Sequence, residues 1–252
     1  MTLRRKKIGC YCAVFCSAVV ANAAFAGPPF QTDDPEPLDV GEHELYIAME
    51  QTRTETGFSG NRPLVELNYG ALSNLQIGIG IPYAFNNPQH GSSEHGLGDV
   101  ELSAKYRFLQ ETNNQPMVSF FPMVALPSGD ADKGLGNGKP QIFLPIWLQK
   151  NWSAWQSNAG GGYWINHAAE ARNHWFFGWQ VQKKFSEQWS LGSEIFYSSE
   201  EIPGEGASSG FNVGGTYALD EYNHLLFSAG RGLSNERTTN QFSSYLGYQL
   251  TW

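Results

Sequence analysis

Two histidines and a glutamate in one segment are the first residues whose types and spacing could do chemistry. His90 and His95 flank Glu94, and imidazole and carboxylate groups are among the ligands of zinc. Nothing else close in the sequence completes a coordination shell, and the segment is rich in glycine and serine. A solvated loop is the simpler interpretation, so we predict no metal.

The segment Gly129–Pro140 has the glycine and lysine content of a phosphate-binding loop. Its spacing fails, because proline follows the lysine where such loops have serine or threonine. Asp130 and Asp132 could bind calcium, but that ion takes six or more oxygen ligands. A flexible outer loop is the favoured interpretation.

A hydrolase would need a serine or aspartate paired with a histidine that a third group orients. His174 and His224 fall on the inward parity of predicted strands, and serine is abundant. No local motif joins them, so we predict no catalytic residue and no enzyme.

The strands that would position these side chains are clearest near Trp252. Between Gln241 and Trp252, apolar residues alternate with mostly polar ones, and this period of two predicts a strand with one apolar face. A terminal strand with an outward aromatic end resembles the signature that the barrel-assembly machinery reads. We therefore expect that machinery to be a partner.

Eleven further segments have strand character, although two contain prolines, Pro122 and Pro145, that count against them. In Gly98–Leu109, four of the five inward candidates are charged, which fits either the lumen of a barrel or the solvent face of a sandwich. The twelve predicted strands are Glu42–Thr52, Pro63–Ala71, Asn74–Phe85, Gly98–Leu109, Gln115–Leu126, Pro140–Gln149, Trp152–Ile165, Asn173–Lys183, Gln188–Ser198, Gly210–Leu219, Asn223–Gly232 and Gln241–Trp252.

The predicted connections alternate between long polar segments, of which Arg53–Arg62 is the first, and short ones such as Leu72-Ser73. Outer-membrane barrels show this alternation, with short periplasmic turns and longer outside loops. We therefore predict an all-β fold, a twelve-stranded antiparallel transmembrane β-barrel. Two aromatic girdles are expected: Phe108, Trp152, Trp189, Tyr222 and Trp252 on the periplasmic side, and Tyr83, Phe85, Trp164, Trp175, Tyr197 and Phe211 on the outer side.

The start of the chain predicts export. Residues 1–26 combine four basic residues, an apolar run and the Ala24-Phe25-Ala26 cleavage motif, as a signal peptide does. Its removal takes the net charge from −8 to −12, since the leader holds four basic and no acidic residues; such acidity argues against nucleic acid binding. All three cysteines precede residue 17. Residues 27–40 form a Pro- and Asp-rich periplasmic arm that could tuck into the barrel mouth, and residues 41–252 form the barrel.

The residues predicted to face inward carry the functional hypothesis. An excess of carboxylates over cations would favour cations in an open lumen, whereas in a narrow lumen the same charges would pair and only stabilise the barrel. Inward aromatic residues, Tyr46, Phe143, Trp147, Phe196 and also Trp164, would suit an aromatic or weakly polar solute. The lumen-lining candidates are Glu44, Glu50, Glu66, Asp99, Glu101, Lys105, Arg107, His174, Gln180 and Glu194.

The segment Gly96–Phe108, with the sequence GLGDVELSAKYRF, resembles a family of bacterial outer-membrane barrels labelled "MetA-pathway of phenol degradation". Ala125-Leu-Pro-Ser-Gly129 and Thr32-Asp-Asp-Pro35 resemble further parts of that family. The resemblance implies a transporter in the bacterial outer membrane that passes hydrophobic or aromatic compounds.

The predicted function is therefore passive passage of small solutes through an outer-membrane channel or transporter, with no cofactor. Expected partners are outer-membrane lipid, the assembly machinery and a small-molecule solute, but no nucleic acid. Two alternatives stay open. A structural barrel with a blocked lumen would show tightly paired charges, and an outer-membrane enzyme acting on lipid would bring a serine and a histidine together near the outer leaflet.

Overall fold

The computed structural model describes residues 28–168 and 171–252. The expected signal peptide lies outside these residues. The described elements are β1 (His43–Thr54), β2 (Gly57–Leu72), β3 (Leu75–Pro88), β4 (Glu94–Leu97), β5 (Val100–Leu109), β6 (Met117–Phe120), β7 (Met123–Leu126), a 3-10 helix (Ala131–Lys133), β8 (Gln141–Trp152), β9 (Trp155–Asn166), β10 (His174–Lys184), β11 (Trp189–Ser198), β12 (Ser208–Ala218), β13 (Asn223–Ser234), α1 (Glu236–Thr239) and β14 (Phe242–Thr251).

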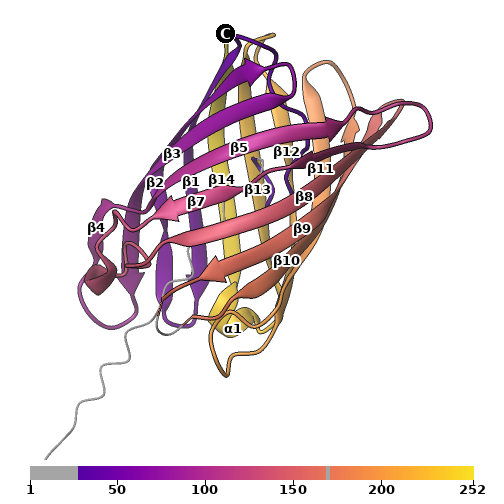
Figure 1. Cartoon of the computed structure of the whole chain (residues 1–252). Helices are drawn as coiled ribbons and strands as arrows, with labels where there is room; N and C mark the ends of the chain where they lie inside the picture. The colour runs from indigo at the N-terminus through magenta and orange to yellow at the C-terminus, as the bar shows by residue number, and fades with distance from the viewer. Residues whose placement is uncertain (1–27, 169–170) are drawn as a thin grey trace, which may run out of the picture.

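The fourteen β segments form one closed antiparallel barrel of twelve strands (Figure 1). Two strands are each split in two: β4 and β5 both pair with β3, and β6 and β7 both pair with β5 and β8. Pairing of β1 with β14 and of β3 with β5 closes the ring. The predicted twelve-stranded barrel is confirmed, and closure leaves no open sheet edge.

The two prolines that counted against strands lie on neighbouring strands. Pro122 has no N–H and interrupts the ladder between β6 and β7, yet the register is kept, with Phe120 opposite Tyr106 and Met123 opposite Ser103. Pro145 lies within β8, and its carbonyl accepts a 3.2 Å hydrogen bond from the Phe121 amide. The carbonyl of Pro122 likewise accepts a hydrogen bond from the Ala104 amide at 3.1 Å, so each proline keeps its acceptor in the ladder and only its N–H is lost.

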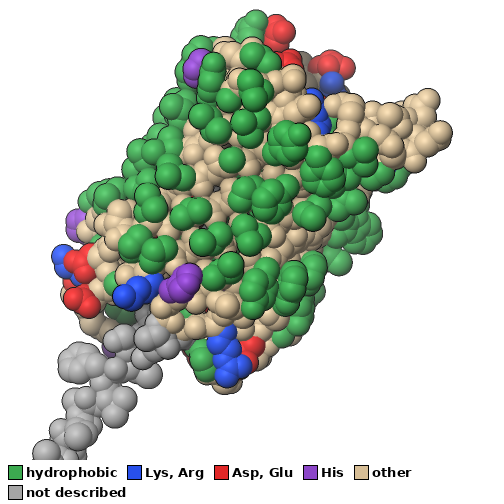
Figure 2. Space-filling view, viewed as in Figure 1, with side chains coloured by type: hydrophobic (Ala, Val, Ile, Leu, Met, Phe, Trp, Pro, Cys, Tyr) green, Lys and Arg blue, Asp and Glu red, His purple; other side chains and the backbone are tan. Residues whose placement is uncertain are grey.

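The outer surface of the barrel is apolar because each strand alternates in burial. On β10, Trp175, Phe177 and Trp179 are about half exposed, whereas Phe176 and Gln180 are buried. On the face in view, the space-filling picture shows such apolar side chains as a band across the middle of the molecule, with charged side chains near its two ends (Figure 2). A band of this kind faces lipid in transmembrane barrels. Among the described residues, no helix is long and apolar enough to cross a membrane.

The aromatic girdles are only partly as predicted. All five residues of the periplasmic set are exposed. In the outer set, Tyr83, Trp175 and Tyr197 are exposed, but Trp164 is 5 % exposed and lies inside the barrel, and Phe85 is 7 % exposed. Phe85 has the outward parity, but the Arg62 guanidinium covers its ring at 3.7 Å from the centroid.

One long connection was wrongly predicted. The segment Arg53–Arg62 was expected to be a loop, but β1 runs to Thr54 and β2 begins at Gly57, so only Glu55 and Thr56 connect them. The strands continue past the apolar band, where polar residues occupy both faces and the alternation that marks a strand is lost. The outer connections 127–140 and 199–207 are longer than the turns at the other end of the barrel, where the chain reaches Trp252 and residues 110–116 form the longest turn.

Candidate functional site

One wall of the barrel interior is aromatic. Phe143 stacks on Trp164 with ring centroids 4.5 Å apart, and Phe176 meets the edges of Phe143 and Trp147. This wall is formed by the split strand β6/β7 and strands β8, β9 and β10, with Phe196 of β11 packed at its margin. Trp147 is 1 % exposed. The wall consists of Phe121, Met123, Phe143, Trp147, Trp164 and Phe176.

The facing wall, on β1, β2 and β5, is acidic. Glu50 accepts a hydrogen bond from Asn61 at 2.6 Å, and Glu66 accepts one from Asn68 at 2.8 Å. These amide side chains stabilise the half-buried carboxyls by donating hydrogen bonds to them. The wall consists of Glu44, Glu50, Glu66 and Glu101.

Between the two walls runs the arm, described from residue 28 to residue 40. Glu194 of β11, itself 2 % exposed, anchors it. The Glu194 carboxylate accepts hydrogen bonds from the amides of Gln31 and Thr32 and from the Thr32 hydroxyl, each at 2.8 Å. It also accepts one from Asn212 at 2.7 Å. Four donors converge on one buried carboxylate, which is how a buried charge is stabilised.

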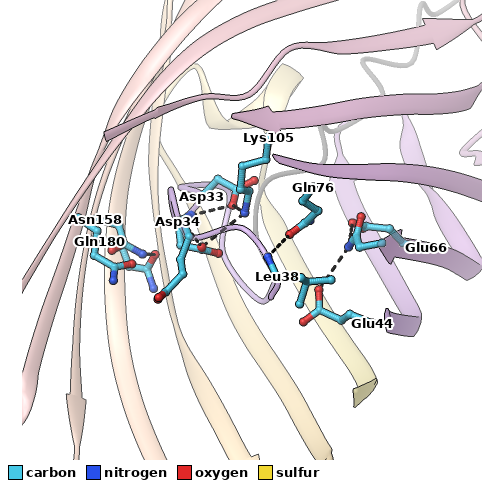
Figure 3. A network of polar contacts seen from close by, with 12 residues as sticks. Asp33, Asp34, Leu38, Glu44, Glu66, Gln76, Lys105, Asn158 and Gln180 are labelled. Atoms are coloured by element: carbon cyan, nitrogen blue, oxygen red, sulfur yellow. Dashed lines mark hydrogen bonds and ion pairs between the residues drawn. The ribbon is translucent and has the colours of Figure 1, made fainter. Parts of the chain in front are cut away.

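A second anchor is ionic. Lys105 of β5 lies 3.2 Å from Asp33 and 3.4 Å from Asp34, and its ammonium is 4.7 Å from the ring centroid of Phe121. Further along the arm, the Leu38 amide donates to Gln76 at 3.0 Å. Figure 3 shows these contacts, with the arm between Asn158 and Gln180 on one side and Glu44 and Glu66 on the other.

The arm also requires glycine in the barrel wall. A Cβ at Gly178 would lie 2.2 Å from the Thr32 hydroxyl oxygen, and a Cβ at Gly70 would lie 1.9 Å from the Asp39 carbonyl oxygen. Asp33 belongs to the arm and not to a strand. Burial raises the pKa of its carboxyl to about 7, against the opposing effect of the nearby Lys105 ammonium.

A cavity of about 420 Å³ remains beside the arm. Of the described residues, Lys105 is the one basic residue that lines it, whereas several carboxylates do. Its polar lining includes Asp33, Asp34, Glu36, Glu44, Glu66, Asn68, Gln76, Glu101, Ser103, Lys105 and Gln249. The cavity therefore has an excess of negative charge.

The remaining predicted lumen residues lie in three places. Gln180 is buried in the wall and accepts a hydrogen bond from Asn158 at 3.5 Å. His174 stacks on Trp164 and its Nδ1 lies 3.2 Å from the Arg172 carbonyl oxygen. Two predicted lumen residues hold connections instead of facing the cavity. The Asp99 carboxylate accepts the amides of Gly129 and Asn137, and Arg107 donates to the Ser73 carbonyl and the Asn74 side chain.

The sequence analysis expected an arm that could tuck into the barrel mouth and placed Glu194 and Lys105 in the lumen, but it missed that these two side chains hold Thr32, Asp33 and Asp34 of the arm. Thr32, Asp33 and Asp34 lie in a segment without periodicity, and Glu194 is more than 160 residues from the amides that it accepts. The one available signal was the set of polar inward residues without a nearby partner of opposite charge, of which Glu194 is an example.

The loop residues with metal-ligand character are not assembled into a site. Among residues 28–168 and 171–252, no group of three or more His, Cys, Asp or Glu side chains could hold a metal ion. Glu94 accepts a hydrogen bond from Ser92, and His95 lies beside Tyr83 with ring centroids 6.1 Å apart. Lys133 pairs with Asp130 at 3.2 Å.

A closed barrel with an apolar outer band and a polar lumen defines a class of protein, the transmembrane β-barrel of the bacterial outer membrane. Within this class, residues 50–250 match the model of the family described as "Putative MetA-pathway of phenol degradation". The chain belongs to that family.

Solved structures share the fold at low sequence identity. An outer membrane channel from Pseudomonas putida F1 superposes with a TM-score of 0.74 at 14 % identity, over 87 % of this chain and 98 % of that one. The KdgM porin in complex with disordered oligogalacturonate has a TM-score of 0.58 at 11 % identity, over 82 % and 99 %. The NanC porin has 0.59 at 7 %, over 82 % and 98 %. A comparison with curated proteins finds no match.

Proposed function

We propose that this protein is an outer-membrane channel for the passive passage of small solutes, and that its lumen favours cationic solutes with an aromatic or apolar part. The observation that carries the proposal is the lining of the cavity, where Glu44, Glu66 and Glu101 of the acidic wall meet Phe121 and Met123 at the edge of the aromatic wall. Carboxylates attract cations, and the faces of aromatic rings also attract them. A solute that carries both a positive charge and a ring would contact the carboxylates and also Phe121 and Met123 at the edge of the aromatic wall.

The lumen-lining roles of Glu44, Glu66 and Glu101 are part of this proposal. They line the cavity, and Asn68 donates hydrogen bonds to Glu44 and Glu66. Among the described residues none of the three carboxyls forms an ion pair, so a cationic solute could take that place. Glu194 and Lys105 have another role, because both hold the arm. We infer that the arm narrows the passage and that solutes pass beside it or when it is displaced.

The blocked barrel is the second candidate, and the arm is the observation that favours it. It predicts no conductance as long as Glu194 and Lys105 hold the arm. We propose no enzymatic activity. The neighbours described above are channels and porins. His174 contacts the Arg172 carbonyl oxygen through its Nδ1 and stacks on Trp164. Outer-membrane lipid and the assembly machinery, through the strand that ends at Trp252, are the proposed partners.

Single-channel recording tests the proposal. Refolded protein, shown to be folded by its heat-modifiable gel mobility, is added to a planar bilayer. We expect discrete conductance steps that an aromatic amine blocks at lower concentration than an aliphatic amine of equal charge. Equal block by the two amines would remove the aromatic wall from the proposal. Silence from folded wild-type protein, with steps from the Glu194→Ala variant, would favour the blocked barrel.

A further inference from the structure

An alternating row of arginine and phenylalanine crosses the outward face of the barrel at the loop end. Register places Arg53 of β1 between Phe58 of β2 and Phe242 of β14. The pairing of Gly230 with Ser243 continues this row to Arg231 of β13, which is opposite Phe211 of β12. Both arginines are exposed. All residues of the row lie on the outward face of their strands, in the order Phe58, Arg53, Phe242, Arg231 and Phe211.

A third arginine lies near this row, because its guanidinium covers Phe85, which is opposite Gly60, two residues along β2 from Phe58. Arg62 of β2 is exposed and lies 3.7 Å above the ring centroid of Phe85, and Arg53 lies 5.3 Å from that of Phe58. Aromatic rings hold the guanidinium planes in place while leaving their N–H groups free for another acceptor. Among the described residues, Arg53, Arg62 and Arg231 have no carboxylate partner, whereas Arg237 on the same side pairs with Glu55 at 2.9 Å.

The row lies at one edge of the lipid-facing band. Phe242 is ten residues from Trp252 on the same strand. At about 3.4 Å per residue and a tilt of about 40°, that distance is roughly 25 Å along the membrane normal, which equals the usual height of the apolar band. Trp252 belongs to the periplasmic girdle, so the arginines lie at the level of the outer-leaflet head groups.

We propose that Arg53, Arg62 and Arg231 form a binding site for the phosphate groups of the outer-leaflet glycolipid. Arginine is suited to phosphate because its planar fork donates two parallel hydrogen bonds. Arg53 and Arg231 are separated by one strand, about 10 Å in a sheet with 4.8 Å spacing, so neighbouring phosphates of one head group can reach both. The phenylalanines contact the upper acyl chains, and the site is independent of what passes through the lumen.

Binding of lipid A tests this proposal. The full protein is refolded into phosphatidylcholine nanodiscs that contain increasing amounts of lipid A with two phosphates, or the same lipid after phosphatase treatment, and bound lipid A is counted by native mass spectrometry. The variant combines Arg53→Gln, Arg62→Gln and Arg231→Gln. The matched control is Arg237→Gln, which removes an arginine on the same side that already has a carboxylate partner.

We expect the triple variant to bind phosphorylated lipid A at least about tenfold more weakly, because each lost guanidinium removes a charge-assisted contact. The control should bind as the wild type does, and the dephosphorylated lipid should bind weakly to all three. Equal binding by wild type and triple variant would overturn the proposal, as would equal binding of the two lipids by the wild type. If the triple variant does not fold, Arg231→Gln alone should still weaken binding about threefold, and an unchanged affinity would overturn the proposal.

Discussion

The aromatic wall and the acidic wall of the barrel interior face each other but are stabilised by different interactions. Phe143, Trp147 and Trp164 pack as rings with almost no exposed surface, so this wall stabilises the fold through apolar burial and ring contacts. Glu44 and Glu66 lie in the other wall with amide partners, and among the described residues neither forms an ion pair. Burying carboxylates in this way costs free energy.

We infer from this difference that the aromatic wall stabilises the fold and that the acidic wall serves the function. The stability that a packed core provides accounts for the aromatic wall. An excess of carboxyl groups inside the barrel does not increase stability. Side chains whose burial costs free energy and that line a cavity are candidates for contact with a solute. Four changes sharpen this comparison, and the largest expected effect comes from the aromatic wall.

Substitution Trp147→Ala should destabilise the barrel by about 3–5 kcal/mol, because it opens a cavity among packed rings. Trp152→Ala, in the exposed periplasmic girdle, is the control and should cost far less. Unfolding in guanidinium, followed by the loss of heat-modifiable gel mobility, measures both. Equal destabilisation by the two variants would contradict the view that the aromatic wall is a stabilising core.

Substitution Glu194→Ala should release the arm. Three donors of the arm lose a charged acceptor, and a hydrogen bond to a charged group contributes about 1.5–3 kcal/mol. The fraction of molecules with the arm in place should therefore fall more than about tenfold.

Because the sequence contains no cysteine after residue 16, a Pro35→Cys probe, at a position that is fully buried with the arm in place, can report that release by its maleimide labelling rate. Its rate should rise in the Glu194→Ala background, and conductance should rise with it. Glu50→Ala, which removes a carboxylate of the acidic wall that has no bond to the arm, serves as the control. An unchanged labelling rate in the Glu194 variant would show that this carboxylate does not hold the arm.

Substitution Gly178→Ala should displace the arm by steric overlap, since its Cβ would lie 2.2 Å from the Thr32 hydroxyl oxygen. Gly80→Ala is a matched lumen control, because its Cβ would meet Glu101 at an ordinary 3.7 Å. Adding Thr32→Ala to the Gly178 variant removes the overlapping oxygen. The conductance of this double variant should return part of the way to the wild-type value. A double variant that conducts as the single Gly178 variant does would place the cause elsewhere.

Acidification should hold the arm more firmly, by a smaller amount. The pKa of Asp33 is raised to about 7 with the arm in place, whereas an aspartate of a released arm has the ordinary value of about 3.9, so the docked arm takes up a proton as the pH falls from 8 to 6. This contribution therefore favours the docked arm at low pH and is lost as the pH rises through about 7. The labelling rate of Pro35→Cys should fall between pH 8 and pH 6, after correction for thiol ionisation, and Asp33→Asn should remove most of that fall.

Alternation along the chain was enough to predict the twelve strands, because a period of two with one lipid-facing side is a strong local signal. It failed where both faces are polar, as in the hairpin at Glu55, and it could not tell a covered outward ring from an exposed one, as at Phe85. Parity also identified Glu194 as inward. What it could not give was the path of the arm, because Thr32 and Asp33 have no periodicity and their partners come from strands far along the chain.

The reversal potential of the refolded protein under a salt gradient tests the central claim most directly. The account predicts that current is carried mainly by cations. It also predicts that Glu44→Gln, Glu66→Gln and Glu101→Gln together move the permeability ratio toward one while the barrel stays folded. Anion preference in the wild type, or a ratio unchanged in the triple variant, would contradict the claim that the acidic wall sets what passes through this barrel.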